Sequence, residues 1–192
     1  MEVIKSILFF LIVVANISFS QVQAQSIIRP GLIRSQLTIS PSYMFADKNS
    51  YFYLHGNLEG FLEDNVSLSG EGYLSLGNTS SVKSKFDYNH SLFCGINWHF
   101  TRKNNDLYIG IQPGLSFTKL SSVENNLATT SNGVNPLFST VVGYNFYLNK
   151  FFHFFLQSRL VIGKHGYDMS KNLSELRFSA GLGFHINAIK RN

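Results

Sequence analysis

Apolar and polar residues alternate along this chain in short stretches, and the alternation restarts eight times. The stretch over residues 86–100 shows it clearly, with large apolar side chains at most even positions and small or polar ones at most odd positions. Successive side chains of a β-strand point to opposite faces of the sheet, so each stretch predicts a strand with one apolar and one polar face. The predicted strands cover residues 32–43, 52–62, 66–76, 86–100, 107–117, 134–148, 151–162 and 176–186.

The connections between these strands alternate in length. Those at residues 63–65, 101–106 and 149–150 are short, whereas those at 77–85, 119–133 and 163–175 are longer and rich in Ser, Asn, Thr and Lys; only 46–50 is brief on the second side. Outer-membrane barrels combine short periplasmic turns with longer external loops, and a tilted strand needs roughly 9–11 residues to cross hydrocarbon. The pattern therefore predicts an all-β fold, a transmembrane antiparallel up-and-down β-barrel of eight strands.

A different segment precedes the alternating part. Lys5 is followed by an apolar run over residues 6–19, and Val22 and Ala24 occupy the −3 and −1 positions of a signal-peptidase site. The run is shorter than the roughly 20 apolar residues of a membrane-spanning helix and contains Asn16. We therefore expect a signal peptide over residues 1–24, cleaved near Ala24, and an outer-membrane β-barrel domain over residues 25–192.

Periodicity alone does not say which face of the sheet points outward. A soluble lipocalin-like barrel, a periplasmic carrier of an apolar ligand, would place the apolar face inside. The polar face is nearly free of lysine, which a solvated surface would use freely. It carries acids and bases that would pair in a barrel interior, namely Arg34, Glu59, Glu71, Asp87, Arg159 and Arg177. We therefore expect apolar side chains to face lipid and these six residues to form a structural interior network.

Aromatic residues support the same facing. One group lies at the ends of strands that would meet at the periplasmic rim: Trp98, Phe100, Tyr144, Phe146, Phe152, Phe154 and Phe184. Tyr43, Phe52, Phe86 and Tyr88 would form the opposite girdle, because such rings collect at membrane interfaces. A second set shares the polar face and would fill the interior beside the charged network: Tyr53, Phe61, Tyr73, Phe93, Tyr108, Tyr147 and Phe155. An interior filled in this way disfavours a wide aqueous channel.

Charge and composition exclude several kinds of function. The net charge of +5 is spread along the chain and is not interleaved with aromatic residues, so no nucleic-acid partner is expected. Cys94 is the single cysteine and lies on the apolar, lipid-facing phase. The histidines His90, His99, His153, His165 and His185 fall on different strands or loops without metal-ligand spacing, and no metal or cofactor is expected.

Two features complicate this interpretation. His90 and Ser91 beside Asp87 suggest a hydrolase, but alternation puts His90 on the face opposite Ser91, beyond the reach that a base needs. A lipid-modifying barrel enzyme stays an alternative that would need Ser, His and an acid at the external rim. Proline removes a ladder donor, so Pro113 predicts a bulge or local break within its strand, and Pro136 is placed at the external rim.

The leader, the strand number, the alternating connections and the final strand over residues 176–186 together resemble the small eight-stranded outer-membrane barrels of the OmpA/OmpX type. The resemblance covers nearly all of the sequence after the leader and implies a Gram-negative cell-envelope protein. Its implied partners are outer-membrane lipids, the barrel-assembly machinery that reads the terminal strand, and a ligand or protein at the external loops. We expect a non-enzymatic barrel with a filled interior and a structural or surface-interaction role through those loops.

Overall fold

The computed structural model describes residues 30–46, 48–78, 86–124, 127–167 and 171–188. The signal peptide expected over residues 1–24 lies outside these ranges, as does most of the loop expected over 77–85. Within the described ranges, no helix has the length and apolar character needed to cross a membrane.

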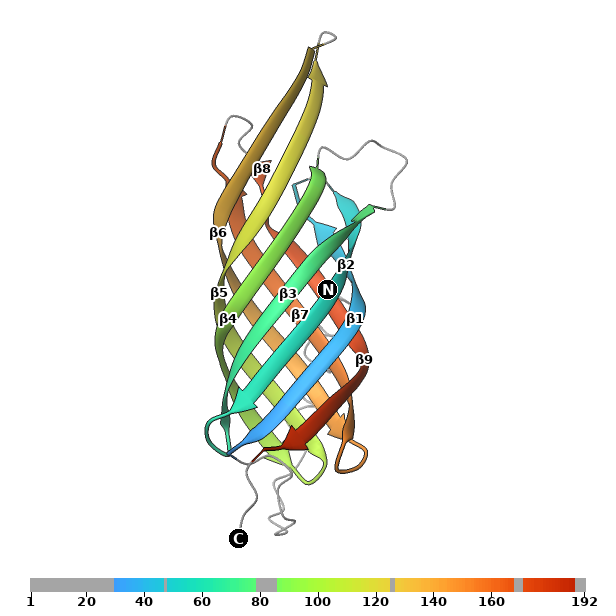
Figure 1. Ribbon diagram of the computed structural model, residues 1–192, viewed down its shortest axis with the longest axis vertical. Helices are drawn as coiled ribbons and strands as arrows, with labels where there is room; N and C mark the ends of the chain where they lie inside the picture. The colour runs from blue at the N-terminus through green and yellow to red at the C-terminus, as the bar shows by residue number, and fades with distance from the viewer. Residues whose placement is uncertain (1–29, 47, 79–85, 125–126, 168–170, 189–192) are drawn as a thin grey trace, which may run out of the picture.

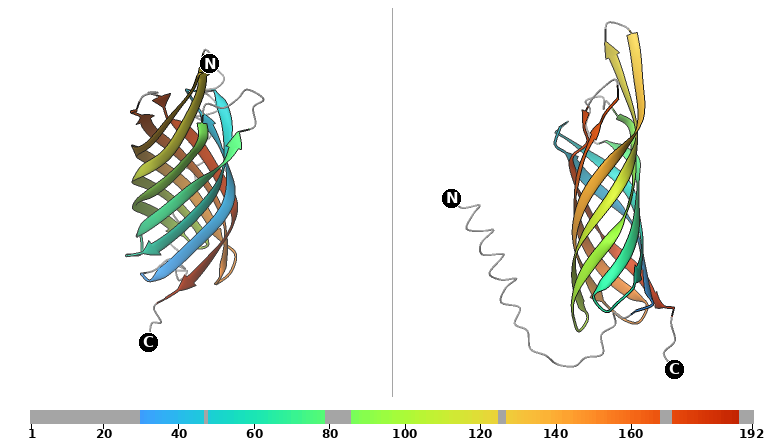
Figure 2. Two further views of the ribbon diagram at one scale, coloured as in Figure 1. Left: turned by 45° about the horizontal axis from the view of Figure 1, so that its top comes forward. Right: turned by 90° about the vertical axis from the view of Figure 1, so that its left-hand side faces the viewer.

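The described residues form nine antiparallel strands, and eight of them close into a barrel (Figures 1 and 2). Strands β1 to β7 pair in chain order, β7 pairs next with β9, and β9 closes the sheet against β1. The short β8 pairs only with the end of β7. The strands are β1 (Leu32–Met44), β2 (Asn49–Phe61), β3 (Val66–Asn78), β4 (Phe86–Arg102), β5 (Asn105–Glu124), β6 (Leu127–Tyr147), β7 (Phe152–His165), β8 (Lys171–Asn172) and β9 (Glu175–Asn187).

All eight predicted strands are confirmed, and β5 and β6 are much longer than predicted. Tight connections at residues 62–65, 103–104 and 148–151 gather at one end of the barrel, which we call the turn end. At the other end β5 and β6 continue beyond the neighbouring strands and project as a two-stranded hairpin, which we call the hairpin end (Figure 1). The loop expected over residues 119–133 is therefore wrong, because most of it is paired strand, from Leu120 opposite Ser131 to Glu124 opposite Leu127.

The facing of the side chains is that of a membrane barrel. Leu37, Leu58, Ile109 and Leu156 are among the many large apolar side chains exposed on the outer surface, while Ser, Asn, Gln, His, Arg and Glu side chains are buried inside. The soluble lipocalin-like alternative is wrong, because it requires the reverse facing. Cys94 is exposed on the outer surface, as predicted.

Both prolines lie at positions where the pairing with one neighbouring strand is interrupted or has ended, so no backbone N–H is needed there. Pro113 stays within a continuous β5, but the pairing of β4 with β5 is interrupted between Phe93–Gly114 and Ile96–Ile111 without a change of register. The predicted irregularity at Pro113 is thus a local break and not a bulge. Pro136 lies inside β6, one residue beyond the point where its pairing with β7 ends, so the edge strand tolerates it.

A bulge at the start of β4 changes the facing of its first residues. The β4–β5 register shifts between Phe86 and Tyr88, so Phe86 turns inward and is buried while Asp87 is exposed. The expectation that Phe86 belongs to the outer aromatic girdle is wrong for this reason. The predicted girdle at the turn end is present, since all seven of its aromatic side chains are exposed on the outer surface.

Apolar side chains close the interior at both ends. Leu32, Phe61 and Tyr147 form a small buried cluster at the turn end. A larger buried cluster lies toward the hairpin end and includes Met44, Tyr51, Phe86, Leu120, Leu137, Val161 and Leu173. The larger cluster also includes Tyr53, Tyr73 and Phe93, whose rings lie against the buried arginines Arg159 and Arg177.

Because the outer surface meets hydrocarbon, a charge placed there is expected to destabilise the barrel. Ile111 lies near the middle of the outward apolar residues of β5, from Leu107 to Phe117. Ile111→Arg is expected to lower the free energy of unfolding by about 2–4 kcal/mol in lipid vesicles. Urea titration followed by the fluorescence of Trp98, the single tryptophan, measures the change.

The control is Thr130→Arg, an exposed position on the projecting hairpin, where the change should be under about 0.5 kcal/mol. Equal effects at Ile111 and Thr130 would contradict the lipid-facing assignment.

Candidate functional site

The interior of the barrel holds three arginines whose side chains are fully buried, Arg34, Arg159 and Arg177. Each comes from a different strand, β1, β7 or β9, at a position that alternation turns inward. A buried charge is tolerated only when it is paired and hydrogen-bonded, so the partners of each arginine decide whether this interior is stable.

Arg34 holds the charged cluster at the turn end. Its guanidinium pairs with Glu59 on the adjacent strand and lies 2.8 Å from Asp106 on β5. It also donates to the Tyr147 hydroxyl at 2.9 Å. His99 bridges the two acids, with Nδ1 2.9 Å from Asp106 and Nε2 3.2 Å from Glu59. This cluster joins β1, β2, β4, β5 and β6.

Arg159 and Glu71 form the central cluster. The guanidinium lies 2.5 Å from the Glu71 carboxylate and donates to the Gln112 side-chain oxygen at 2.8 Å. His55 approaches the same carboxylate at 2.9 Å, and its ring stacks on Tyr73 with centroids 4.2 Å apart. Because Glu71 belongs to β3 and Arg159 to β7, this ion pair crosses the barrel interior.

Arg177 holds the third cluster, nearer the hairpin end. Its guanidinium lies 2.5 Å from Glu175 and donates to the Ser91 hydroxyl at 2.7 Å. The guanidinium carbon lies 4.3 Å from the Tyr53 ring centroid and 4.4 Å from that of Tyr73. Such cation–π contacts add to the ion pair where water is excluded.

The structure places five of the six predicted network residues in these three clusters and separates the sixth. Asp87 is 40 % exposed on the outer surface, where it lies 3.5 Å from Lys119 and accepts from the Ser121 hydroxyl. The bulge between Phe86 and Tyr88 causes this, because one extra residue reverses the facing of Asp87. The interior acids that were missed are Asp106 and Glu175.

Glu175 and Asp106 carried weak signals in the sequence. Glu175 lies two residues before Arg177 and thus on the same face of its strand, but the composition of residues 163–175 predicts a loop. Asp106 lies within the turn predicted over residues 101–106, whereas the turn in the structure comprises only residues 103–104. Lys103 adopts a φ of 53°, the left-handed conformation that allows so tight a connection.

The histidines do not gather around a common point. His153 and His185 contact each other near the turn end, with their Nδ1 atoms 3.2 Å apart, and Gln36 contacts His153 at 3.1 Å. His90 lies on the outer surface, stacked on Tyr88. Among the residues that the structure describes, no three His, Cys, Asp or Glu side chains are arranged to hold a metal ion.

Ser67, His99 and Asp106 lie in the order of a nucleophile, a base and an acid. The Ser67 hydroxyl is 2.8 Å from His99 Nε2, and His99 Nδ1 is 2.9 Å from Asp106. The Ser67 hydroxyl nevertheless donates to Glu59, and all of these side chains are buried in the ion-paired interior. A nucleophile needs an accessible substrate position beside it, which this serine lacks.

A second Ser–His contact lies at the hairpin end. Ser131 Oγ is 3.0 Å from His165 Nε2, and the other ring nitrogen of His165 contacts the Thr118 hydroxyl at 2.8 Å. His90 and Ser91, adjacent in sequence, lie on opposite faces of β4, and Ser91 accepts from Arg177.

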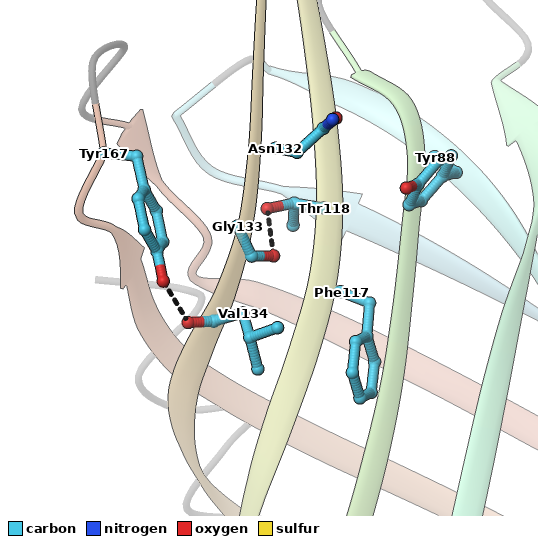
Figure 3. A pocket seen from close by; sticks show the side chains of 7 residues that line it. All are labelled: Tyr88, Phe117, Thr118, Asn132, Gly133, Val134 and Tyr167. Atoms are coloured by element: carbon cyan, nitrogen blue, oxygen red, sulfur yellow. Dashed lines mark hydrogen bonds between the residues drawn. The ribbon is translucent and has the colours of Figure 1, made fainter.

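An open cavity of about 360 Å³ lies near the hairpin end, over β4, β5 and β6 (Figure 3). Tyr88, Phe117, Asn132 and Val134 line it, and Tyr167 closes one edge by donating from its hydroxyl to the Val134 carbonyl at 3.1 Å. The cavity is thus a feature of the wall near the projecting hairpin, separate from the three charged clusters.

A closed barrel of eight antiparallel strands, apolar outside and charged inside, has the fold of the small transmembrane β-barrels of the outer membrane. Solved structures of this class are similar to it. Neisserial surface protein A matches with a TM-score of 0.63 and 10 % identity, over 81 % of this chain and 96 % of that chain. Ail, the attachment invasion locus protein of Yersinia pestis, matches with a TM-score of 0.56 and 13 % identity, over 82 % of this chain and 99 % of that chain.

A second structure of Ail, in complex with the heparin analogue sucrose octasulfate, matches with a TM-score of 0.56 and 12 % identity over the same shares. No family model and no curated protein matches the sequence. At these identities the likeness shows the fold, which is that of the OmpA/OmpX type of eight-stranded outer-membrane barrel.

Removing one partner of the central ion pair is expected to be costly. Glu71→Gln leaves the Arg159 charge buried without its carboxylate and should lower the free energy of unfolding by about 3–5 kcal/mol. The double variant Glu71→Gln with Arg159→Met should be less destabilised than the sum of the two single variants, because both charges are gone. Urea unfolding in detergent micelles measures all three variants.

Asp87→Asn is the matched control for this experiment. It removes an acid from an exposed pair, so the free energy of unfolding should change by under about 1 kcal/mol. A loss at Asp87 as large as that at Glu71 would place Asp87 in the network and contradict the structure.

Proposed function

We propose that this protein is a non-enzymatic outer-membrane barrel that presents the β5–β6 hairpin outside the cell for interaction with a partner. The observation that carries the proposal is a division of the molecule into two parts. The barrel interior is occupied by ion-paired side chains and closed by apolar clusters, while β5 and β6 alone extend far beyond the rim (Figures 1 and 2). We infer that the barrel serves as the support and the hairpin as the contact surface.

The filled interior argues against transport as the main role. Gln112 shows how extensively the interior side chains hydrogen-bond to one another. Its amide nitrogen lies within hydrogen-bonding distance of Ser69, Glu71 and Asn97, and its side-chain oxygen accepts from Arg159. A channel for solutes would have to break several such contacts between charged groups, each worth about 1.5–3 kcal/mol.

The enzyme alternative has less support. The Ser67 group is buried, and the Ser131 group has a hydroxyl where a catalytic acid would orient the histidine. We therefore propose no reaction, no metal and no cofactor for this chain.

Export and assembly complete the proposal. The leader over residues 1–24 would direct the chain across the inner membrane and be cleaved near Ala24. The final strand β9 (Glu175–Asn187), apolar on its outer face, would be read by the barrel-assembly machinery. The turn end would then face the periplasm and the hairpin end the exterior.

Ail, with which this chain shares its fold, has been crystallised with a heparin analogue. In this chain lysines lie near the hairpin end, at Lys48, Lys119, Lys164 and Lys171. A sulfated glycan is accordingly one partner class to include when binding is assayed, together with extracellular-matrix proteins.

Shortening the hairpin tests the division of roles. Replacing residues 121–130 with an Asn-Gly turn should leave the barrel folded, because these residues lie beyond the charged clusters and Asn-Gly favours a two-residue hairpin. Bacteria displaying the shortened protein should attach to matrix-coated or heparin-coated surfaces no better than bacteria without it.

Two measurements separate the outcomes. Cell fractionation with a gel of boiled and unboiled samples reports whether each protein reaches the outer membrane as a closed barrel. If the shortened barrel assembles and attachment is unchanged, the hairpin is not the contact surface and the proposal is contradicted.

A further inference from the structure

We propose that the outer surface of β4, β5 and β6 carries a binding site, called the seat below, for an anionic membrane lipid. The seat lies where the lipid-facing apolar surface ends on the side of the hairpin end. Lys119 would contact the phosphate headgroup, and Phe117 and Val134 would contact the first part of an acyl chain. The inference rests on the proposed function only in requiring that the barrel lie in a membrane.

The register of the three strands builds the seat as two rows of side chains. Tyr88, Lys119 and Asn132 lie directly opposite one another on β4, β5 and β6. The row two residues nearer the membrane holds His90, Phe117 and Val134. Their neighbours Asn89, Thr118 and Leu120 are buried, so alternation turns both rows outward.

The two rows differ in polarity in the way that a lipid boundary requires. The upper row offers an ammonium, an amide and a phenol hydroxyl, whereas Phe117 and Val134 below it are exposed apolar side chains. The open cavity near the hairpin end, of about 360 Å³, lies over this transition, and Figure 3 shows Phe117 and Val134 below Asn132. The next outward positions toward the membrane, Leu92 and Leu115, are also exposed, so the seat continues into the lipid-facing surface.

This continuity indicates what occupies the seat. A surface that joins the hydrocarbon-facing band meets lipid, and a lysine at that height attracts anionic headgroups. Tyr167 closes the β6 side of the cavity by donating to the Val134 carbonyl, and Tyr88 stacked on His90 forms the β4 side. The occupant is therefore a lipid with a phosphate headgroup, held at one end by charge and at the other by apolar contact.

Asp87 is the competitor of this headgroup. Its carboxylate lies 3.5 Å from the Lys119 ammonium, longer than the roughly 2.7–2.9 Å of a close charge-assisted hydrogen bond. Both side chains are more than a third exposed, so water screens the pair and a phosphate is able to replace the carboxylate. Asp87 and Lys119 should consequently have opposite effects on lipid binding.

The experiment uses the full-length mature protein in nanodiscs of phosphatidylcholine with a minority of phosphatidylglycerol. Native mass spectrometry then counts the lipids that stay bound. Phosphatidylglycerol should be enriched on the wild-type protein, and Lys119→Gln should reduce the enrichment about fivefold, the factor expected for one interfacial lysine. Asp87→Asn should increase it, and Lys48→Gln, at an exposed turn between β1 and β2, should leave it unchanged.

Several results would overturn the lipid seat. These are an enrichment that Lys119→Gln leaves intact, a decrease on Asp87→Asn, or an equal decrease on Lys48→Gln. Glycerol 3-phosphate is added as the headgroup without acyl chains. Competition by this compound at concentrations equal to the lipid would indicate a free-phosphate site instead, whereas no competition supports the lipid. A gel of boiled and unboiled samples confirms that each variant is a closed barrel, so failure of the seat is distinguishable from failure of the membrane assignment.

Discussion

The buried arginines impose the constraint on which the rest of this structure depends. Arg159 and Arg177 lie directly opposite each other on β7 and β9, where two like charges would repel. The arrangement is stable because each has its own acid, Glu71 from β3 and Glu175 from β9. The central pair joins strands on opposite sides of the barrel, so the ionic contacts form only when the sheet has closed in its correct register.

The same constraint explains the distribution of polarity. Because hydrocarbon surrounds the barrel, the polar side chains of its strands point into the interior. The interior of an eight-stranded barrel is just wide enough for side chains to fill it. Apolar clusters close the ends, with Leu32, Phe61 and Tyr147 at one and a larger group around Phe86 and Leu173 at the other. A barrel so filled has little freedom left for transport, and its outer surface and projecting hairpin are the parts that are free to meet partners.

Sequence alternation was sufficient to predict the barrel, its eight strands and their facing. Of the acids and arginines buried in the described interior, it indicated Arg34, Glu59, Glu71, Arg159 and Arg177 but not Asp106 and Glu175. It failed where the period of two is interrupted. A single-residue bulge reversed Phe86 and Asp87, and no pattern in the sequence marks that bulge. The projecting part of the hairpin reads as a loop because residues 119–133 are mostly small and polar, with no apolar face to bury. The pairing of Arg34 with Asp106 depends on register across the barrel, which alternation does not encode.

The central claim is that the apolar face of this sheet meets lipid, and Trp98 reports on it directly. Trp98 is the single tryptophan, and its side chain is 44 % exposed on the outer surface near the turn end. The decisive measurement is quenching of its fluorescence by phosphatidylcholines brominated at different depths of the acyl chain, with the protein reconstituted in vesicles. The structure predicts strong quenching, greatest for bromines near the headgroups, because Trp98 belongs to an interfacial aromatic girdle. Fluorescence unaffected by every brominated lipid would show that this face does not contact the membrane and would contradict the account.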